Sequence, residues 1–207
     1  MSKIQKYPLW FGLITICILL GSCILSNDRF TWIMEVFPIL IGFPILFFTY
    51  KNFKLTRLLY SLILIHFVIL SIGGIYTYAK VPLGFWMQDW FGFSRNHYDR
   101  IGHFAQGFIP AILVRELLLR TSPLKKGKWL SFIVVCVCLA ISATYEFIEW
   151  WSSVIQGASA EAFLGTQGDV WDAHWDMLFA TIGAIVALVS LSKLHNKFLA
   201  KEVGLQF

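Results

Sequence analysis

Six apolar segments, each close to the length that a helix needs to cross a bilayer, constrain this chain more than any other feature. A transmembrane helix takes about 20 predominantly apolar residues. Segments of this kind lie at residues 7–25, 32–50, 56–78, 100–119, 129–151 and 172–194. With 57% hydrophobic and only 14% charged residues, the composition is that of a membrane protein. The sequence therefore predicts an all-α, polytopic membrane protein in which residues 1–207 form one domain of six transmembrane helices.

The basic residues predict the orientation of this domain, because Lys and Arg in short loops are retained on the cytoplasmic side. Twelve of them fall on one side of the six-helix arrangement, in residues 3–6, 51–57, 120–128 and 193–201. Four fall on the other side, namely Arg29, Lys80, Arg95 and Arg100. We therefore expect both termini in the cytoplasm. The net charge of +5 reflects this topology, and because the basic residues form no single patch, we expect no nucleic-acid binding.

Two segments allow more than one interpretation. The first apolar segment ends in Leu20-Gly21-Ser22-Cys23, which resembles a lipoprotein signal, but its apolar character continues to Leu25 and we expect a retained transmembrane helix. The connection at residues 79–99 is too short to span and too aromatic for a solvated loop, so we expect it to lie in the membrane interface. It is either a plain connector or a lid over a site.

Ionisable residues occur in pairs at the outer ends of three of the predicted helices. The pairs are Asp99 and His103, Glu146 and Glu149, and Asp172 and Asp176. Residues three or four apart share one face of a helix, so each pair can point inward as a unit. Because ionisable groups within membranes usually mark an ion site, a proton path or a substrate site, we expect the three pairs to meet.

Helix capping is the simplest structural explanation for some of these residues. Asp99, Asp169 and Asp172 come at helix starts, where a carboxylate can accept hydrogen bonds from free backbone N–H groups. Glu146 and Glu149 lie near the C-terminal end of a helix, where the helix dipole disfavours an anion. Capping therefore does not explain these two glutamates.

His103 and Asp176 lie about one turn inside their helices, beyond the capping position, and this favours a role in chemistry. Several carboxylates close together require shared protons or a bound cation. We expect a divalent metal, zinc, manganese or magnesium, because carboxylates with one imidazole suit these ions. The candidate ligands are His103, Glu146, Glu149, Asp176, Asp172 and Asp99. Alternatively, Arg95, Arg100 and His97 pair with the acids or hold an anionic lipid headgroup.

Several other polar or small residues receive structural interpretations. Four small residues are expected to permit close helix packing, namely Gly102, Gly107, Gly183 and Ala187. Arg115 and Glu116 are expected to form an interfacial pair at the inner end of the fourth helix, with the arginine snorkelling. His174 points away from the face of Asp172 and Asp176, so we exclude it from the site.

The order of these motifs resembles that of the VanZ-like membrane proteins. The matching elements are Asp99-Arg100-Ile101-Gly102-His103-Phe104, then Glu146 and Glu149, then Gly168-Asp169 with Asp172, Asp176 and Gly183-Ala184, within residues 98–187. Asp176 departs from the family, which commonly has asparagine there, and the basic residue expected before the last helix is missing. Over its full length the chain resembles the YjdF type of bacterial inner-membrane protein. The resemblance implies a multi-pass protein of the bacterial inner membrane, with some VanZ-like members linked to glycopeptide-antibiotic tolerance, and implies no reaction.

Three functions are compatible with these features. The first is an enzyme-like or accessory protein that uses a metal at the outer leaflet and has membrane lipid and a lipid-linked or cell-envelope substrate as partners. The second is a small transporter or proton-coupled carrier, and the third is a non-catalytic membrane scaffold. We favour the first, because carriers often contain inverted repeats and sites near the bilayer midplane, whereas these charges gather near one surface.

Overall fold

The computed structural model describes residues 3–156 and 166–205, and these residues form helices and connections without a β-strand. The elements are α1 (Lys3–Leu25), α2 (Arg29–Thr49), α3 (Arg57–Tyr76), the 3₁₀ helix η1 (Tyr78–Lys80), α4 (Pro82–Phe91), α5 (Tyr98–Thr121), α6 (Lys128–Gln156) and α8 (Asp172–Val203). The predicted all-α class is confirmed. Each of the six predicted segments coincides with a long helix.

Five of these helices are long and apolar enough to cross a membrane, namely α1, α2, α3, α6 and α8. The helix α5 is long enough, with 24 residues, but it carries charged residues at both ends. Asp99 and Arg100 at one end and Arg115 and Glu116 at the other are all buried against neighbouring helices. Lipid therefore does not meet these charges. The sixth span remains a prediction, and it falls on this central helix.

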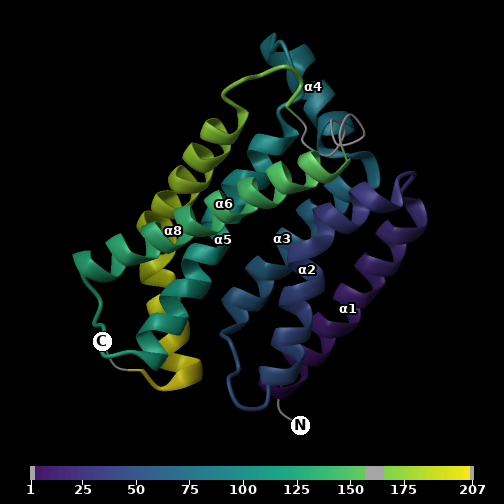
Figure 1. Ribbon diagram of the computed structural model, residues 1–207. Helices are drawn as coiled ribbons and strands as arrows, with labels where there is room; N and C mark the ends of the chain where they lie inside the picture. The colour runs from purple at the N-terminus through teal and green to yellow at the C-terminus, as the bar shows by residue number, and fades with distance from the viewer. Residues whose placement is uncertain (1–2, 157–165, 206–207) are drawn as a thin grey trace.

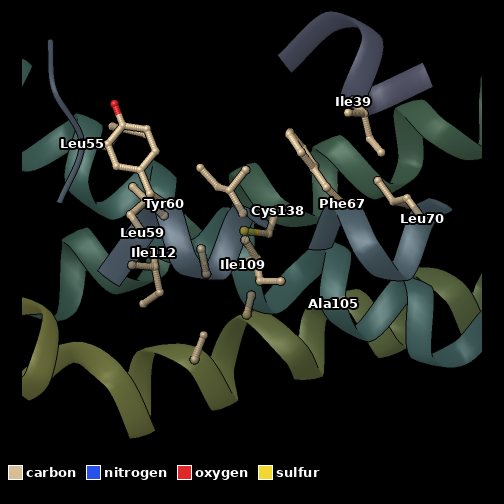
Figure 2. Close-up of a cluster of buried hydrophobic side chains, with 14 of the residues drawn as sticks. Ile39, Leu55, Leu59, Tyr60, Phe67, Leu70, Ala105, Ile109, Ile112 and Cys138 are labelled. Atoms are coloured by element: carbon tan, nitrogen blue, oxygen red, sulfur yellow. The ribbon is translucent and has the colours of Figure 1, made fainter. Parts of the chain in front are cut away.

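The long helices form two groups that meet along α3 and α5 (Figure 1). In the first group α3 packs against both α1 and α2. In the second group α5 packs against α6 and against α8, and the α5–α8 interface is the most extensive among the described helices. The core between the groups contains side chains from several helices, including Phe67 of α3, Ile109 of α5 and Cys138 of α6 (Figure 2).

Two glycines allow α5 and α8 to lie unusually close together. A Cβ atom at Gly107 of α5 would collide with the backbone carbonyl of Ala180, and one at Gly183 of α8 would collide with the carbonyl of Phe104. Small residues at an interface let helix backbones approach in a membrane, where hydrocarbon gives helices no hydrophobic reason to associate. The packing role predicted for these two glycines is confirmed.

The first helix is an integral part of the fold. The hydroxyls of Tyr7 in α1 and Ser61 in α3 lie 2.6 Å apart. The ring of Phe11 is buried against those of Tyr60 and Phe67, with centroids 5.1 and 6.0 Å away. These contacts cover part of the apolar face of α3, and the retention of this helix stays a prediction.

The two ends of the molecule differ in character. The described ends of the chain lie at one end, and α4 lies at the other (Figure 1). In α4, Trp86, Trp90 and Phe91 are exposed, which suits the predicted interfacial position.

Asp28 caps the start of α2 by accepting hydrogen bonds from the backbone N–H groups of Phe30 and Thr31. Its carboxylate also accepts a hydrogen bond from the Thr31 hydroxyl, and this bond is the main reason for the lowered pKa of Asp28.

Candidate functional site

The beginnings of α5 and α8 are joined by a network of arginines and aspartates. Arg100 lies 2.6 Å from the Asp172 carboxylate through Nη2 and also pairs with Asp176 through Nη1. Arg95 lies 2.8 Å from the same Asp172 oxygen. Each arginine is 3.4 Å from Asp169. The i, i+4 spacing of Asp172 and Asp176 places both on the face of α8 that meets α5.

A histidine with two carboxylates lies directly beside this network. His103 Nε2 is 3.4 Å from Asp99 Oδ1, one turn earlier in α5, and 3.6 Å from Asp176 Oδ1 of α8. One ligand atom from each of these three buried residues lies within 4.8 Å of the other two, a spacing that could hold a metal ion. The group joins α5 to α8, so its geometry depends on their close packing at Gly107 and Gly183.

The second nitrogen of His103 faces a different acid. Nδ1 lies 3.9 Å from Oε1 of Glu146 in α6, which is too far for a hydrogen bond. The side chains of His103 and Glu146 are only 6% and 11% exposed, and neither atom has a hydrogen-bond partner among the described residues. Buried polar atoms are nearly always hydrogen-bonded, so these two mark a place where a ligand or ion would fit.

A cavity of about 450 Å³ adjoins the histidine and extends away from it along the helices. Its polar end is lined by Glu35 of α2, Asp99 and His103 of α5, and Tyr145 and Glu149 of α6. Tyr145 also donates a hydrogen bond of 3.2 Å to the carbonyl of Met34, which connects α6 to α2 at this end. The remainder of the lining is mainly apolar. A ligand here would meet carboxylates at one end and hydrocarbon at the other.

The structure brings most of the six candidate metal ligands together. Asp99, His103 and Asp176 form the compact group, and Glu146 lies beside it. Asp172 lies outside that group because the two arginines engage its carboxylate. Glu149 lines the cavity. The expected meeting of the three pairs at one place is therefore seen for five of the six side chains, with Asp172 directed to the arginines.

The capping interpretation is wrong for the three aspartates, because α5 and α8 both begin without a side-chain cap. Asp169 accepts a 2.9 Å hydrogen bond from the backbone N–H of Trp171 immediately before α8. Asp99 and Asp172 instead face His103 and the arginines. The exclusion of His174 is supported, because its side chain is exposed and packs on Trp171.

His97 directly precedes α5 and lies close to Arg95 and Arg100 of the arginine network. Its ring lies edge-on to Phe93, with centroids 4.8 Å apart. Burial lowers the pKa of His97 below 6.5, and the positive charges of Arg95 and Arg100 lower this pKa further. A neutral imidazole does not attract an anion, so of the three residues predicted to hold an anionic headgroup only Arg95 and Arg100 carry the required charge. Both arginines pair with Asp172.

Glu35 is a site residue that the sequence analysis missed. It is buried in the N-terminal half of α2 and lines the polar end of the cavity with Glu149. The available signal was its position as a lone carboxylate within an apolar segment, which is itself a functional indication. Glu35 has no second acid three or four residues away, so it is not one of the pairs that predicted the site.

A second buried polar network lies at the C-terminal end of α5, where a snorkelling arginine was expected. That expectation was wrong: Arg115 is buried and contacts His195 Nδ1 at 2.8 Å and Asn196 at 2.6 Å. His195 Nε2 lies 2.9 Å from Glu116. A guanidinium can only donate, so Nδ1 accepts and Nε2 carries the proton that is donated to Glu116. Its contacts with α8 keep the Arg115 guanidinium inside the helix bundle.

Comparisons with known proteins agree with this architecture. The family described as "Predicted membrane protein (DUF2238)" matches residues 7–197. This chain belongs to the DUF2238 family. It is also similar to "Inner membrane protein YjdF" of Escherichia coli strain K12, with 48% identity over 184 residues that cover 89% of this chain and 88% of that protein. No solved structure matches it significantly.

Membership of the DUF2238 family establishes the cellular setting of the site. With five helices apolar enough to span and a relative named for the inner membrane, the protein is a multi-pass protein of the bacterial inner membrane. The predicted similarity to the YjdF type is confirmed, and the link to VanZ-like proteins stays a prediction. The family match includes every residue of the arginine network, the histidine group and the cavity.

Proposed function

We propose that this DUF2238 protein binds a divalent cation at the outer ends of α5, α6 and α8 and uses it to act on a lipid-linked or other cell-envelope substrate. The observation that carries the proposal is the environment of His103. Its Nε2 lies in a group with Asp99 and Asp176 whose ligand atoms are within 4.8 Å of one another. Its buried Nδ1 has no hydrogen-bond partner within the described part of the chain and faces Glu146.

The charge balance around His103 supports a cation. Five carboxylates either surround this histidine or line the adjoining cavity: Glu35, Asp99, Glu146, Glu149 and Asp176. Arg100 neutralises one of them by pairing with Asp176. Carboxylates that share a partly apolar site either bind protons or recruit a cation. A divalent ion would compensate two of these charges at once. It would also coordinate His103 Nδ1 or Glu146 Oε1, which have no hydrogen-bond partner among the described residues.

The donor set suits zinc, manganese or magnesium, because it combines one imidazole with several carboxylate oxygens. Arg100 would act from behind the site by fixing the Asp176 carboxylate, as partners outside the coordination sphere commonly do. The cation would polarise a phosphoryl or carbonyl oxygen of the substrate, or lower the pKa of a bound water. The mainly apolar cavity beside it favours a substrate with a hydrocarbon part.

The test compares two histidines of opposite environment. His103→Ala removes the proposed ligand, and His174→Ala removes an exposed imidazole of α8 as the matched control. After purification in detergent, treatment with chelator and incubation with zinc, manganese or magnesium, bound metal is measured by mass spectrometry of the desalted protein. We expect about one ion in wild type and in His174→Ala. Binding to His103→Ala should be weaker by at least about 10- to 100-fold.

Thermal unfolding of the same samples gives a second measurement. Metal should raise the unfolding temperature of wild type and of His174→Ala, because an ion that binds only the folded state stabilises it. It should leave His103→Ala unchanged. A wild-type protein that holds no stoichiometric metal and gains no stability from any of the three ions would contradict the proposal. The carboxylates would then share protons, as in a carrier or a structural network.

A further inference from the structure

The cavity beside the carboxylates has the shape of a groove that follows two facing helices. On α2 its lining residues recur every three or four positions from Glu35 through Pro38 and Gly42 to Thr49. Fourteen residues of helix correspond to roughly 21 Å. On α5 the lining continues from Asp99 to Leu117 with the same spacing. The groove therefore runs from the acidic end well past the depth of one leaflet, which is about 15 Å.

One side of this groove is open to the surroundings of the helices. Ile45 of α2 and Ile141 of α6 both line it, yet they are 55% and 39% exposed. These helices belong to the two different groups of the fold, and the hydrogen bond between Tyr145 and Met34 links them at the outer end. Since α2 and α6 are long and apolar enough to span, the medium beside that opening is hydrocarbon.

The polar end restricts which lipid fits. Among the described residues that line the cavity are Glu35, Asp99 and Glu149, but no lysine or arginine. A bare phosphate would be repelled by these carboxylates, whereas a phosphate that shares a divalent cation with them would be attracted. The apolar chain gains little by moving from bilayer hydrocarbon into the groove, because both surroundings are equally apolar. The binding energy must therefore come from the headgroup.

We propose that the groove between α2 and α5 holds the apolar chain of a membrane lipid that enters between α2 and α6. The phosphate of this lipid binds through the cation beside His103, at the end of the groove that Glu35, Asp99 and Glu149 line. The phosphate and its cation rest on the function proposed above. The chain site rests independently on the groove, its apolar lining and its open side. The volume of about 450 Å³ lies within the roughly 300–1,000 Å³ range of small-molecule sites.

Gly42 offers a way to block the groove without disturbing the acidic end. A Cβ at Gly42 meets nothing within 4 Å, and the residue lies seven positions, roughly 10 Å, along α2 from Glu35. Gly42→Phe would place its ring in the groove. Gly21→Phe in α1 is the matched control, because a Cβ there also meets nothing within 4 Å and Gly21 does not line the cavity. Gly42→Leu is a smaller blocking variant that keeps the test usable if the phenylalanine variant fails to fold.

The measurement is native mass spectrometry of detergent-purified protein incubated with phosphatidylglycerol or, in a second arm, with a polyprenyl phosphate. Each arm is run with manganese and with chelator. We expect about one lipid per protein for wild type and Gly21→Phe with manganese. The affinity of Gly42→Phe for the lipid should be roughly tenfold to a hundredfold weaker, as expected when an added side chain overpacks a site. The arm with the higher wild-type occupancy identifies the source of the phosphate.

The outcomes separate the two proposals. Loss of lipid from Gly42→Phe with metal still bound supports the groove as the chain site. Wild type that retains lipid in chelator, while Gly42→Phe does not, supports the chain site and overturns the cation. Equal lipid occupancy in Gly42→Phe, Gly42→Leu and wild type overturns the groove, whatever the metal content.

Discussion

Removal of the Glu116 carboxylate should destabilise the protein more than removal of any exposed acid. Glu116 is fully buried and accepts four hydrogen bonds: from the Thr56 backbone N–H and hydroxyl at 3.1 and 2.8 Å, from Arg120 at 2.7 Å and from His195 at 2.9 Å. It thereby connects α5 to the start of α3 and to α8. Glu116→Ala would leave the Thr56 and His195 donors without an acceptor at a site closed to water.

The expected cost follows from these contacts. A buried donor left without a partner costs about 1–3 kcal/mol, and breaking a buried ionic pair by deleting one member costs about 3–5 kcal/mol. Because the Arg120 side chain is partly exposed and can turn to solvent, we take the second range for the whole network. For a chain of this size about 2–4 °C is lost per kcal/mol. Glu116→Ala should therefore lower the unfolding temperature by about 6–20 °C.

Thermal unfolding in detergent, followed by the fluorescence of the nine tryptophans, measures this change. Asp89→Ala is the matched control, since it deletes an exposed carboxylate from α4 and should shift stability by no more than about 0.5 kcal/mol. Glu116→Gln keeps the side-chain shape but only one acceptor oxygen, so it should fall between the two. If Glu116→Ala unfolds at the same temperature as Asp89→Ala, the network does not hold α3, α5 and α8 together and this reasoning is wrong.

Two further predictions concern the α5–α8 contact and the histidine that precedes α5. Gly107→Ala should lower the free energy of unfolding by at least about 1–3 kcal/mol, because the new Cβ collides with the Ala180 backbone. Gly42→Ala is the control and should not lower it, because a Cβ there meets nothing within 4 Å. Equal unfolding temperatures for the two variants would contradict this prediction. His97, titrated by NMR of its ring, should show a pKa below 6.5 because of burial and the adjacent arginines. Because the unfolded chain then binds the proton more readily, His97 removes stability as pH falls below 6.5; a pKa at or above 6.5 would exclude this.

The helices of this protein are determined by local sequence. In hydrocarbon every backbone N–H and C=O must find a partner within its own segment, so an apolar stretch of sufficient length has to be helical. Length and hydropathy therefore predicted all six long helices. The exception in hydropathy is α5, whose charged ends are tolerated because other helices bury them.

The helical period predicted which residues of the candidate site share a helix face, but it did not predict their partners on other helices. Spacing of three or four residues places Asp99 with His103, and Asp172 with Asp176, on single faces. It does not say which residue of another helix each face meets. Asp172 and Asp176 lie on the same face of α8, yet they have different partners. Asp172 faces Arg95 and Arg100, whereas Asp176 faces Arg100 and His103.

Only the tertiary structure decided which polar groups became partners. Glu116 and His195 are 79 residues apart, and Glu35 reaches the cavity from a helix whose other residues gave no sign of a site. These partnerships depend on how closely the helices approach, and that approach is set by side-chain shape at contacts such as Gly107 and Gly183. Hydrocarbon favours helix formation in each segment but does not determine which helices pack together. The local sequence therefore determines the helices, whereas the assembly of the site depends on tertiary packing.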